Sequence, residues 1–239
     1  MTTIADNLQR VRERIGTACA GAHRPVNEVT LLAVSKTFGP EAVREAFAAG
    51  QAAFGENYIQ EAVEKMALLQ DLPLQWHCIG PIQSNKTRLV AAHFDWAHTV
   101  DRVKIAQRLS EQRPASSRAL QVCIQVNVDG GAAKAGVPPQ EALALARAVA
   151  QMPRLVLRGL MTIPEPGSDF AAQKAVHLQA RGLFDELRAA GLALDTLSMG
   201  MTADLEAAVA AGSTMLRIGT AIFGGRPPAG VTSWASPLA

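Results

Sequence analysis

The chain has 239 residues, of which 49% are hydrophobic, and its 23 basic and 21 acidic side chains leave a formal net charge of +2. This length and composition support a folded domain with a sizeable core and argue against gross disorder. The nearly balanced charge and an aromatic content of only 5% give no basis for nucleic-acid binding through phosphate contacts or base stacking.

Cysteine usage indicates a reducing compartment. Cys19, Cys78 and Cys123 are odd in number, lie far apart and form no C-x-x-C motif, so we expect neither a disulfide framework nor a metal site. The first residues are too charged for a signal peptide, and no uncharged apolar run reaches membrane-spanning length. We therefore expect a soluble, cytoplasmic protein with no membrane partner.

The chain begins with an amphipathic segment. Ile4, Leu8, Val11 and Ile15 recur at helical spacing with charged residues between them, which predicts a helix over 3–22. Gly21 is placed to end this helix. Because the helix precedes the first strand, it is an addition to the repeating pattern that follows.

Strand-like and helix-like segments then alternate. We predict strands at 29–35, 51–54, 75–79, 95–99, 119–127, 155–161, 194–198 and 214–218, with helices at 40–49, 57–70, 84–92, 101–112, 139–151, 169–190 and 202–211. Eight strands separated by single helices predict a single (β/α)₈ barrel of the TIM type, and a doubly wound open sheet is the alternative. We expect one domain over 1–239, in which an N-terminal helix within 1–24 precedes a barrel over 28–225 and a loose tail over 226–239.

The segment Leu31–Lys36 carries the first chemical signal. Its apolar residues predict a buried strand, which places Lys36 where the strand ends. In barrels and open α/β sheets, reactive groups lie at this end of the strands. A lysine against apolar walls has a lowered pKa and can form a Schiff base with an aldehyde, whereas the simpler interpretation is a lysine whose head reaches into water.

The seventh and eighth predicted strands both end in glycine-containing turns. Ser198–Thr202 follows the seventh strand, and Arg217–Thr220 ends the eighth. Barrels often bind phosphate with these two loops, because glycine allows close approach and backbone N–H groups point at the anion. Ordinary turns with a capping Thr202 are the simpler interpretation. A lysine and a phosphate cradle on one face would together suit a phosphorylated aldehyde, either pyridoxal 5′-phosphate (PLP) or a sugar phosphate.

Short motifs spread along the chain carry a family resemblance. They are, in chain order, Ala33–Lys36, Phe54–Tyr58, Trp76–Gly80 with Gln83, Asn85 and Lys86, Gln125–Asn127, Arg158–Met161, Ser198–Met201 with Asp204, and Arg217–Thr220 with Phe223 and Gly224. Together they resemble the pyridoxal phosphate homeostasis proteins, the YggS/PROSC-like family, which are similar to the barrel domain of bacterial alanine racemases. The resemblance spans nearly the whole chain.

The resemblance implies roles for single residues. Lys36 matches the family's Schiff-base lysine and Asn57 a polar residue near the cofactor. Arg217 matches the arginine that faces the pyridine nitrogen, where a permanent cation disfavours protonation; a strand-end ion pair is the simpler role. Ser198, Thr202, Gly219 and Thr220 match the phosphate-binding segments, and Met199 and Gly200 join them as cofactor-binding candidates. Thr202 stands where the family usually has Ser, which keeps the hydroxyl.

Other residues carry weaker expectations. His77 either faces the pocket or is a hydrogen-bonded structural residue, and Asn85 and Lys86 are interpreted as helix-capping residues. Lys134 is either an ordinary exposed lysine or, by the resemblance, a second and weaker PLP contact. Core packing is the preferred interpretation for Met161, Met199 and Met201, with a soft pocket lining as the alternative.

The function expected from these features is binding, storage and delivery of PLP within the cell, without turnover. The alternative is a PLP-dependent amino-acid racemase, which needs acid/base groups on both faces of its substrate. In alanine racemases a second domain supplies one of these as a tyrosine; we expect no such domain here, and the chain's only tyrosine is Tyr58. A Schiff-base aldolase is less favoured, since no carboxylate stands out beside Lys36. We expect a monomer, with apo PLP-dependent enzymes as transient partners.

Overall fold

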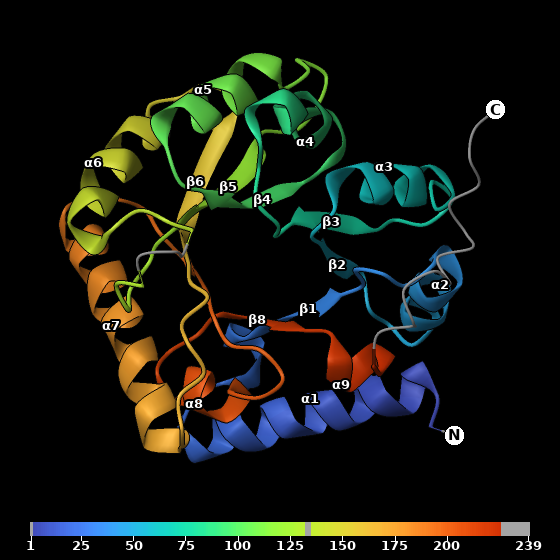
Figure 1. The fold of residues 1–239 in the computed structure, drawn as a ribbon. Helices are drawn as coiled ribbons and strands as arrows, with labels where there is room; N and C mark the ends of the chain where they lie inside the picture. The colour runs from blue at the N-terminus through green and yellow to red at the C-terminus, as the bar shows by residue number, and fades with distance from the viewer. Residues whose placement is uncertain (1, 132–134, 226–239) are drawn as a thin grey trace.

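Eight parallel strands close into a barrel in chain order, with helices around the outside (Figure 1). The computed structural model describes residues 2–131 and 135–225. The strands are β1 (Thr30–Val34), β2 (Ala53–Glu56), β3 (Gln75–Cys78), β4 (Trp96–Val100), β5 (Leu120–Gln125), β6 (Leu155–Met161), β7 (Thr196–Ser198) and β8 (Met215–Ile218). The sheet closes where β1 pairs with β8 in parallel. The predicted (β/α)₈ barrel is therefore confirmed, and the open sheet was the wrong alternative.

The helices fall between the strands as the alternation predicted. They are α1 (Ile4–Gly21), α2 (Pro40–Ala48), α3 (Ile59–Ala67), α4 (Thr87–His93), α5 (Val103–Gln112), α6 (Pro139–Ala150), α7 (Phe170–Ala189), α8 (Leu205–Ala210) and α9 (Thr220–Phe223). Short 3₁₀ turns lie at Val26–Glu28 (η1) and Ser84–Lys86 (η2). None of the helices within the described ranges combines the length and the apolar character that crossing a membrane requires.

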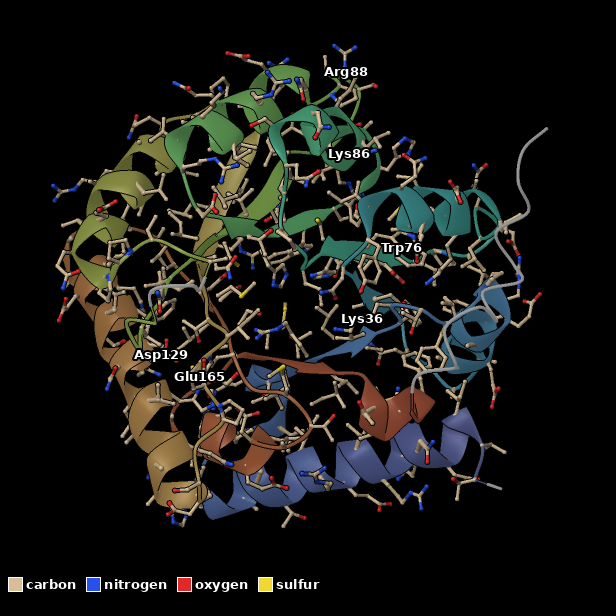
Figure 2. The ribbon with its side chains drawn as sticks, in the orientation of Figure 1. Lys36, Trp76, Lys86, Arg88, Asp129 and Glu165 are labelled. Atoms are coloured by element: carbon tan, nitrogen blue, oxygen red, sulfur yellow. The ribbon has the colours of Figure 1, made fainter. Side chains whose placement is uncertain are left out.

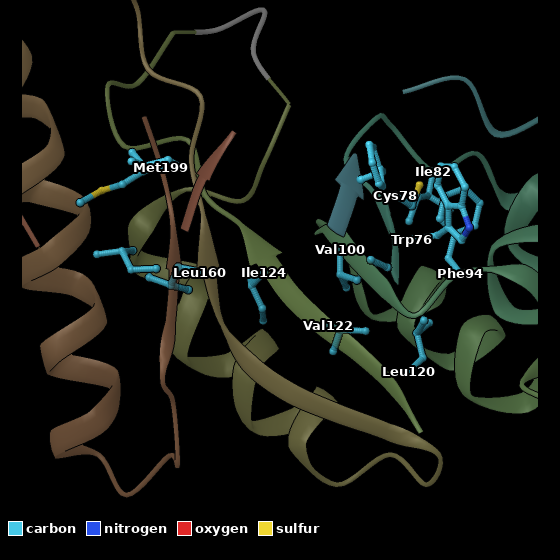
Figure 3. Packing of buried hydrophobic residues seen from close by; sticks show 14 of the residues in the cluster. Trp76, Cys78, Ile82, Phe94, Val100, Leu120, Val122, Ile124, Leu160 and Met199 are labelled. Carbon is cyan, nitrogen blue, oxygen red and sulfur yellow. The ribbon is translucent and has the colours of Figure 1, made fainter. Parts of the chain in front are cut away.

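The strands bury both of their faces, as parallel strands in a barrel must. Alternate residues of β1 point in opposite directions, so Ala33 packs outward against the helices while Leu32 and Val34 join a smaller cluster inside the barrel. Figure 3 shows part of the outer core, with Val122, Ile124 and Leu160 on neighbouring strands. The interior cluster is Leu32, Val34, Ile79, Trp96, Cys123, Met161 and Met215.

The added helix α1 supports the loops at one side of the barrel. It lies along α8 and α9 (Figure 1), and Asn7 donates a hydrogen bond to the Ile222 carbonyl at 2.8 Å. Arg14 pairs with Glu206 of α8 at 2.9 Å and also donates to the Thr202 carbonyl. The helix thus holds in place the segments that follow β7 and β8.

Several predicted boundaries were wrong. The second strand was predicted at 51–54 but begins at Ala53, because Gln51 turns its side-chain amide back onto the Leu31 and Ala53 carbonyls. The helix predicted at 84–92 starts as the turn η2 and becomes α-helical only at Thr87. The short helix α9 was missed, since four residues are too few for a periodic pattern. The expected tail over 226–239 lies outside the described residues.

Candidate functional site

A cavity of about 300 Å³ opens at the carboxyl ends of the strands; β1, β8 and the segments that follow β1, β2, β3, β6, β7 and β8 contribute to its wall. Figure 2 shows Lys36 at the end of β1, inside the ring of strands. Six of the predicted site residues line this cavity: Lys36, Asn57, Thr202, Arg217, Gly219 and Thr220. They come from four separate loops or strand ends, so only the closed barrel brings them together.

Arg217 is the buried cation of the site. Its inward position on β8 leaves it 4% exposed, and its guanidinium donates to Ser198 Oγ at 2.9 Å and to the Thr162 carbonyl at 2.8 Å. Burial lowers the pKa of Arg217 to about 10. Even so lowered, the pKa keeps the group positively charged at neutral pH.

A line of hydrogen bonds runs from Arg217 through the barrel. Ser198 Oγ lies 3.1 Å from His98 Nδ1, His98 Nε2 lies 2.9 Å from His77 Nδ1, and His77 Nε2 lies 3.0 Å from Gln75 Oε1. Burial lowers the pKa of His77 to about 3, and burial, together with the neighbouring His77 and Arg217, lowers that of His98 well below its usual value. Both rings are therefore neutral, and His77 is a structural residue, not a cavity residue.

Ser198, Met199 and Gly200 do not line the cavity. Ser198 and Met199 are fully buried, Ser198 beneath Arg217 and Met199 in the outer core. Gly200 accepts a backbone hydrogen bond from Arg217 at 3.0 Å. Direct contact of these three residues with a ligand stays a prediction, and Ser198 reaches the site through Arg217.

The loop after β7 is held by Asp204. Its carboxylate accepts from the Met201 N–H at 2.6 Å and lies 2.8 Å from His177 Nε2. Burial alone would raise the pKa of Asp204, but these hydrogen bonds lower it overall. The helix α8 begins after Asp204, so the alternative in which Thr202 caps it was wrong.

Two polar atoms in the cavity wall have no hydrogen-bond partner in the described structure. They are Asn57 Oδ1 and Thr37 Oγ1, both shielded from solvent. Buried polar atoms are normally satisfied, so two such atoms beside a lysine fit a site whose ligand is polar. The residue types present therefore fit a phosphorylated aldehyde such as PLP: an amine, a cation, an amide and three threonine hydroxyls.

The remaining predictions have mixed outcomes. Met161 and Met199 pack in cores, whereas Met201 is 40% exposed and lines the cavity, so core packing was wrong for Met201. Asn85 and Lys86 lie in η2, and Lys86 occupies the N-cap position of α4; neither makes a side-chain capping hydrogen bond there, so capping by their side chains was wrong. Lys134 lies outside the described residues. Among the described residues, the Glu165 N–H donates to Asp129 at 2.6 Å, which joins the loops after β6 and β5 (Figure 2).

Sequence reasoning gave no role to four residues behind the cavity wall, although the first two lie within the quoted motifs: Ser35, Glu56, Lys65 and His98. Each is at most 2% exposed. For Glu56 and Lys65, the available signal was a carboxylate at the end of a strand and a lysine on the buried side of the next helix. For His98 it was a polar residue within a fully buried strand.

A closed (β/α)₈ barrel with a lysine-bearing cavity at the carboxyl ends of its strands defines the class of this protein. Residues 2–227 match the family model described as "Alanine racemase, N-terminal domain", and the chain belongs to this family.

Named relatives are similar over nearly their whole length. The pyridoxal phosphate homeostasis protein of Pseudomonas aeruginosa is 59% identical over 226 residues, which cover 95% of this chain and 97% of the relative. The protein of the same name in Escherichia coli K12 is 53% identical and covers 95% and 98%. The solved structure of PipY from Synechococcus elongatus with PLP bound is 40% identical, with a TM-score of 0.81, and covers 93% and 100%.

Proposed function

We propose that this protein binds PLP through Lys36 and serves PLP homeostasis as a carrier without turnover of its own. The observation that carries the proposal is the meeting of Lys36 and Arg217 in one cavity with Thr202 and Thr220. It is supported by the homeostasis proteins that are 59% and 53% identical, and by PipY, whose solved structure has PLP bound.

Each cavity residue has a definite task in this proposal. When bound, PLP supplies an aldehyde that reacts reversibly with an amine. Lys36 provides that amine, while Thr202, Gly219 and Thr220 bind the phosphate through hydroxyl and backbone groups. Arg217 remains charged and would be the residue beside the ring nitrogen, where its fixed guanidinium would disfavour a second positive charge.

The composition of the cavity wall favours a carrier over an enzyme. Its described lining contains no carboxylate, histidine, cysteine or tyrosine, and Arg217 does not exchange protons near neutral pH. Lys36 is therefore the only described lining side chain suited to proton transfer. A racemase needs two such groups and a Schiff-base aldolase needs an acid/base partner for its lysine.

The mouth of the cavity also suits reversible loading. Ile163 and Met201 line it and remain 43% and 40% exposed. An open mouth admits water, which competes with catalysis but lets an aldehyde enter and leave. Apo PLP-dependent enzymes are the proposed recipients of the released cofactor.

Borohydride trapping tests this function. After incubation with PLP and reduction, peptide mapping should find the pyridoxyl label on Lys36, and Lys36→Ala should lose it. The loaded protein should then restore activity to an apo PLP-dependent enzyme while forming no D-alanine from L-alanine. A label confined to other lysines contradicts the binding proposal, and D-isomer formation that disappears in Lys36→Ala supports the racemase instead.

A further inference from the structure

We propose that Glu56 and Lys65 are positioning residues for Lys36: they hold the backbone turn that presents its amine to the cavity. The inference rests on the proposed function, because it concerns how that amine is displayed. It comes from a buried network directly behind the ends of β1 and β2. Neither Glu56 nor Lys65 belongs to the described cavity wall.

The network joins three elements. Lys65 lies on α3 with 1% of its side chain exposed, and its Nζ donates to Glu56 Oε1 at 2.6 Å and to the Ser35 carbonyl at 2.9 Å. Ser35 Oγ donates to the same Glu56 oxygen at 2.6 Å. Ser35 directly precedes Lys36, and Glu56 directly precedes Asn57, so one network fixes the backbone just before two cavity residues.

The Ser35 carbonyl also closes the turn that carries Lys36. It accepts a second hydrogen bond from the Phe38 N–H at 3.1 Å, which leaves Lys36 and Thr37 as the central residues of the turn. Thr37 has φ of +67°, a left-handed conformation that a β-branched residue rarely adopts. This turn is therefore disfavoured by its own sequence and needs support from outside.

The chain supports the turn from two directions. At the start of the turn, Lys65 donates a hydrogen bond to the Ser35 carbonyl. At its end, Phe38 stacks on Phe223 of α9 with ring centroids 5.1 Å apart. A buried ion pair adds little net stability, since removing both charges from water offsets most of their attraction. We attribute the presence of Glu56 and Lys65, at a place where apolar residues would also pack, to their hydrogen bonds that fix the turn carrying Lys36.

The test separates positioning from stability. Glu56→Gln/Lys65→Met removes both charges and leaves no unpaired ion in the core. The measurements are urea unfolding without ligand and the PLP concentration that half-labels Lys36 after borohydride trapping. We expect a folded protein whose affinity for PLP at Lys36 is lower by about ten- to a hundredfold, the range that corresponds to strain at one backbone position.

A rescue variant tests the mechanism itself. Adding Thr37→Asn to the double variant supplies a residue that adopts positive φ more readily and keeps a polar side chain in the cavity wall, so we expect it to recover about half of the lost affinity on a logarithmic scale. The matched control is Arg113→Met, which removes another buried cation that donates to the backbone carbonyls of Ala91 and Phe94. It should reduce stability while leaving the affinity at Lys36 unchanged.

The outcomes are distinguishable. Wild-type affinity in the folded double variant overturns the proposal, and so does a loss of affinity that Thr37→Asn leaves unchanged. If the double variant does not fold, Ser35→Ala removes only one bond of the network and should still weaken labelling of Lys36; wild-type affinity in that variant overturns the proposal. Failure to label Lys36 in the wild-type protein refutes the proposed function itself.

Discussion

His77 Nδ1 and His98 Nε2 lie 2.9 Å apart inside the barrel, and both rings are completely buried. Trp96 stacks on the His77 ring at 5.1 Å and nearly parallel, which fixes its plane. The pair continues through Ser198 to Arg217 at the cavity. Two neutral imidazoles thus connect the interior of the barrel to the buried cation of the candidate site.

This pair should make the protein less stable in acid. The pKa of His77 is about 3 in the folded protein and that of His98 is also well below its usual value of 6.5. The unfolded chain therefore binds more protons than the folded one as the pH falls below 6.5, and the free energy of unfolding decreases by up to about 1.4 kcal/mol per pH unit for each histidine. Urea unfolding at pH 7.5, 6.0 and 5.0 measures this slope.

A double substitution checks the source of that slope. His77→Gln/His98→Gln should flatten the decrease, whereas His93→Gln, at an exposed histidine at the end of α4, should not. A wild-type stability that stays constant from pH 7.5 to 5.0 contradicts the expectation.

The direction of the hydrogen-bonded line predicts the tautomers. The Arg217 guanidinium can only donate hydrogen bonds, so Ser198 Oγ accepts one from it. The Ser198 hydroxyl in turn donates a hydrogen bond to His98 Nδ1. His98 and His77 are then both protonated on Nε2, and the line ends on Gln75 Oε1. Long-range ¹H–¹⁵N NMR spectra should show the Nε2–H pattern for both rings, and an Nδ1–H pattern at His98 would reverse the line.

Gly200→Ala should destabilise the loop after β7. The backbone there has φ of +93°, and an added Cβ would lie 2.4 Å from Ala208 Cβ and 2.8 Å from Leu216 Cδ2. Strain and overlap together predict a loss of about 2–4 kcal/mol in the free energy of unfolding. Gly16→Ala in α1, where nothing lies within 4 Å, should instead stabilise the protein slightly. Equal stabilities of the two variants would show that packing does not require glycine at 200.

Phosphate recognition should depend on the loops after β7 and β8. PLP should bind more tightly than pyridoxal, and loss of one charge-assisted hydrogen bond in Thr202→Ala or Thr220→Ala should cost roughly 1.5–3 kcal/mol of binding free energy. The matched control is Thr17→Ala on the exposed face of α1. Absorbance titrations give the affinities, and equal binding of PLP and pyridoxal is the result that excludes a phosphate site here.

The sequence determined the architecture and one candidate site residue, Lys36. Alternating strand and helix periods are local signals, and each of the eight predicted strands has its counterpart in the barrel. Lys36 was found from an apolar run that ends in a single lysine, and the cavity indeed contains it. Arg217 was assigned by family resemblance, and Thr202 both by resemblance and by its place after the seventh strand; both line the cavity, and their contacts with a ligand stay predictions.

Only the tertiary structure decided which buried polar residues form hydrogen bonds behind the cavity wall. His98 and Ser198 are 100 residues apart in sequence, and Lys65 and Ser35 are 30 apart, yet each pair shares a hydrogen bond. Such meetings depend on strand register and on which side chains point into the closed barrel, because a shift of one residue turns every side chain to the opposite face. A local pattern specifies the elements, but the closure of the sheet determines which polar residues must satisfy one another inside it.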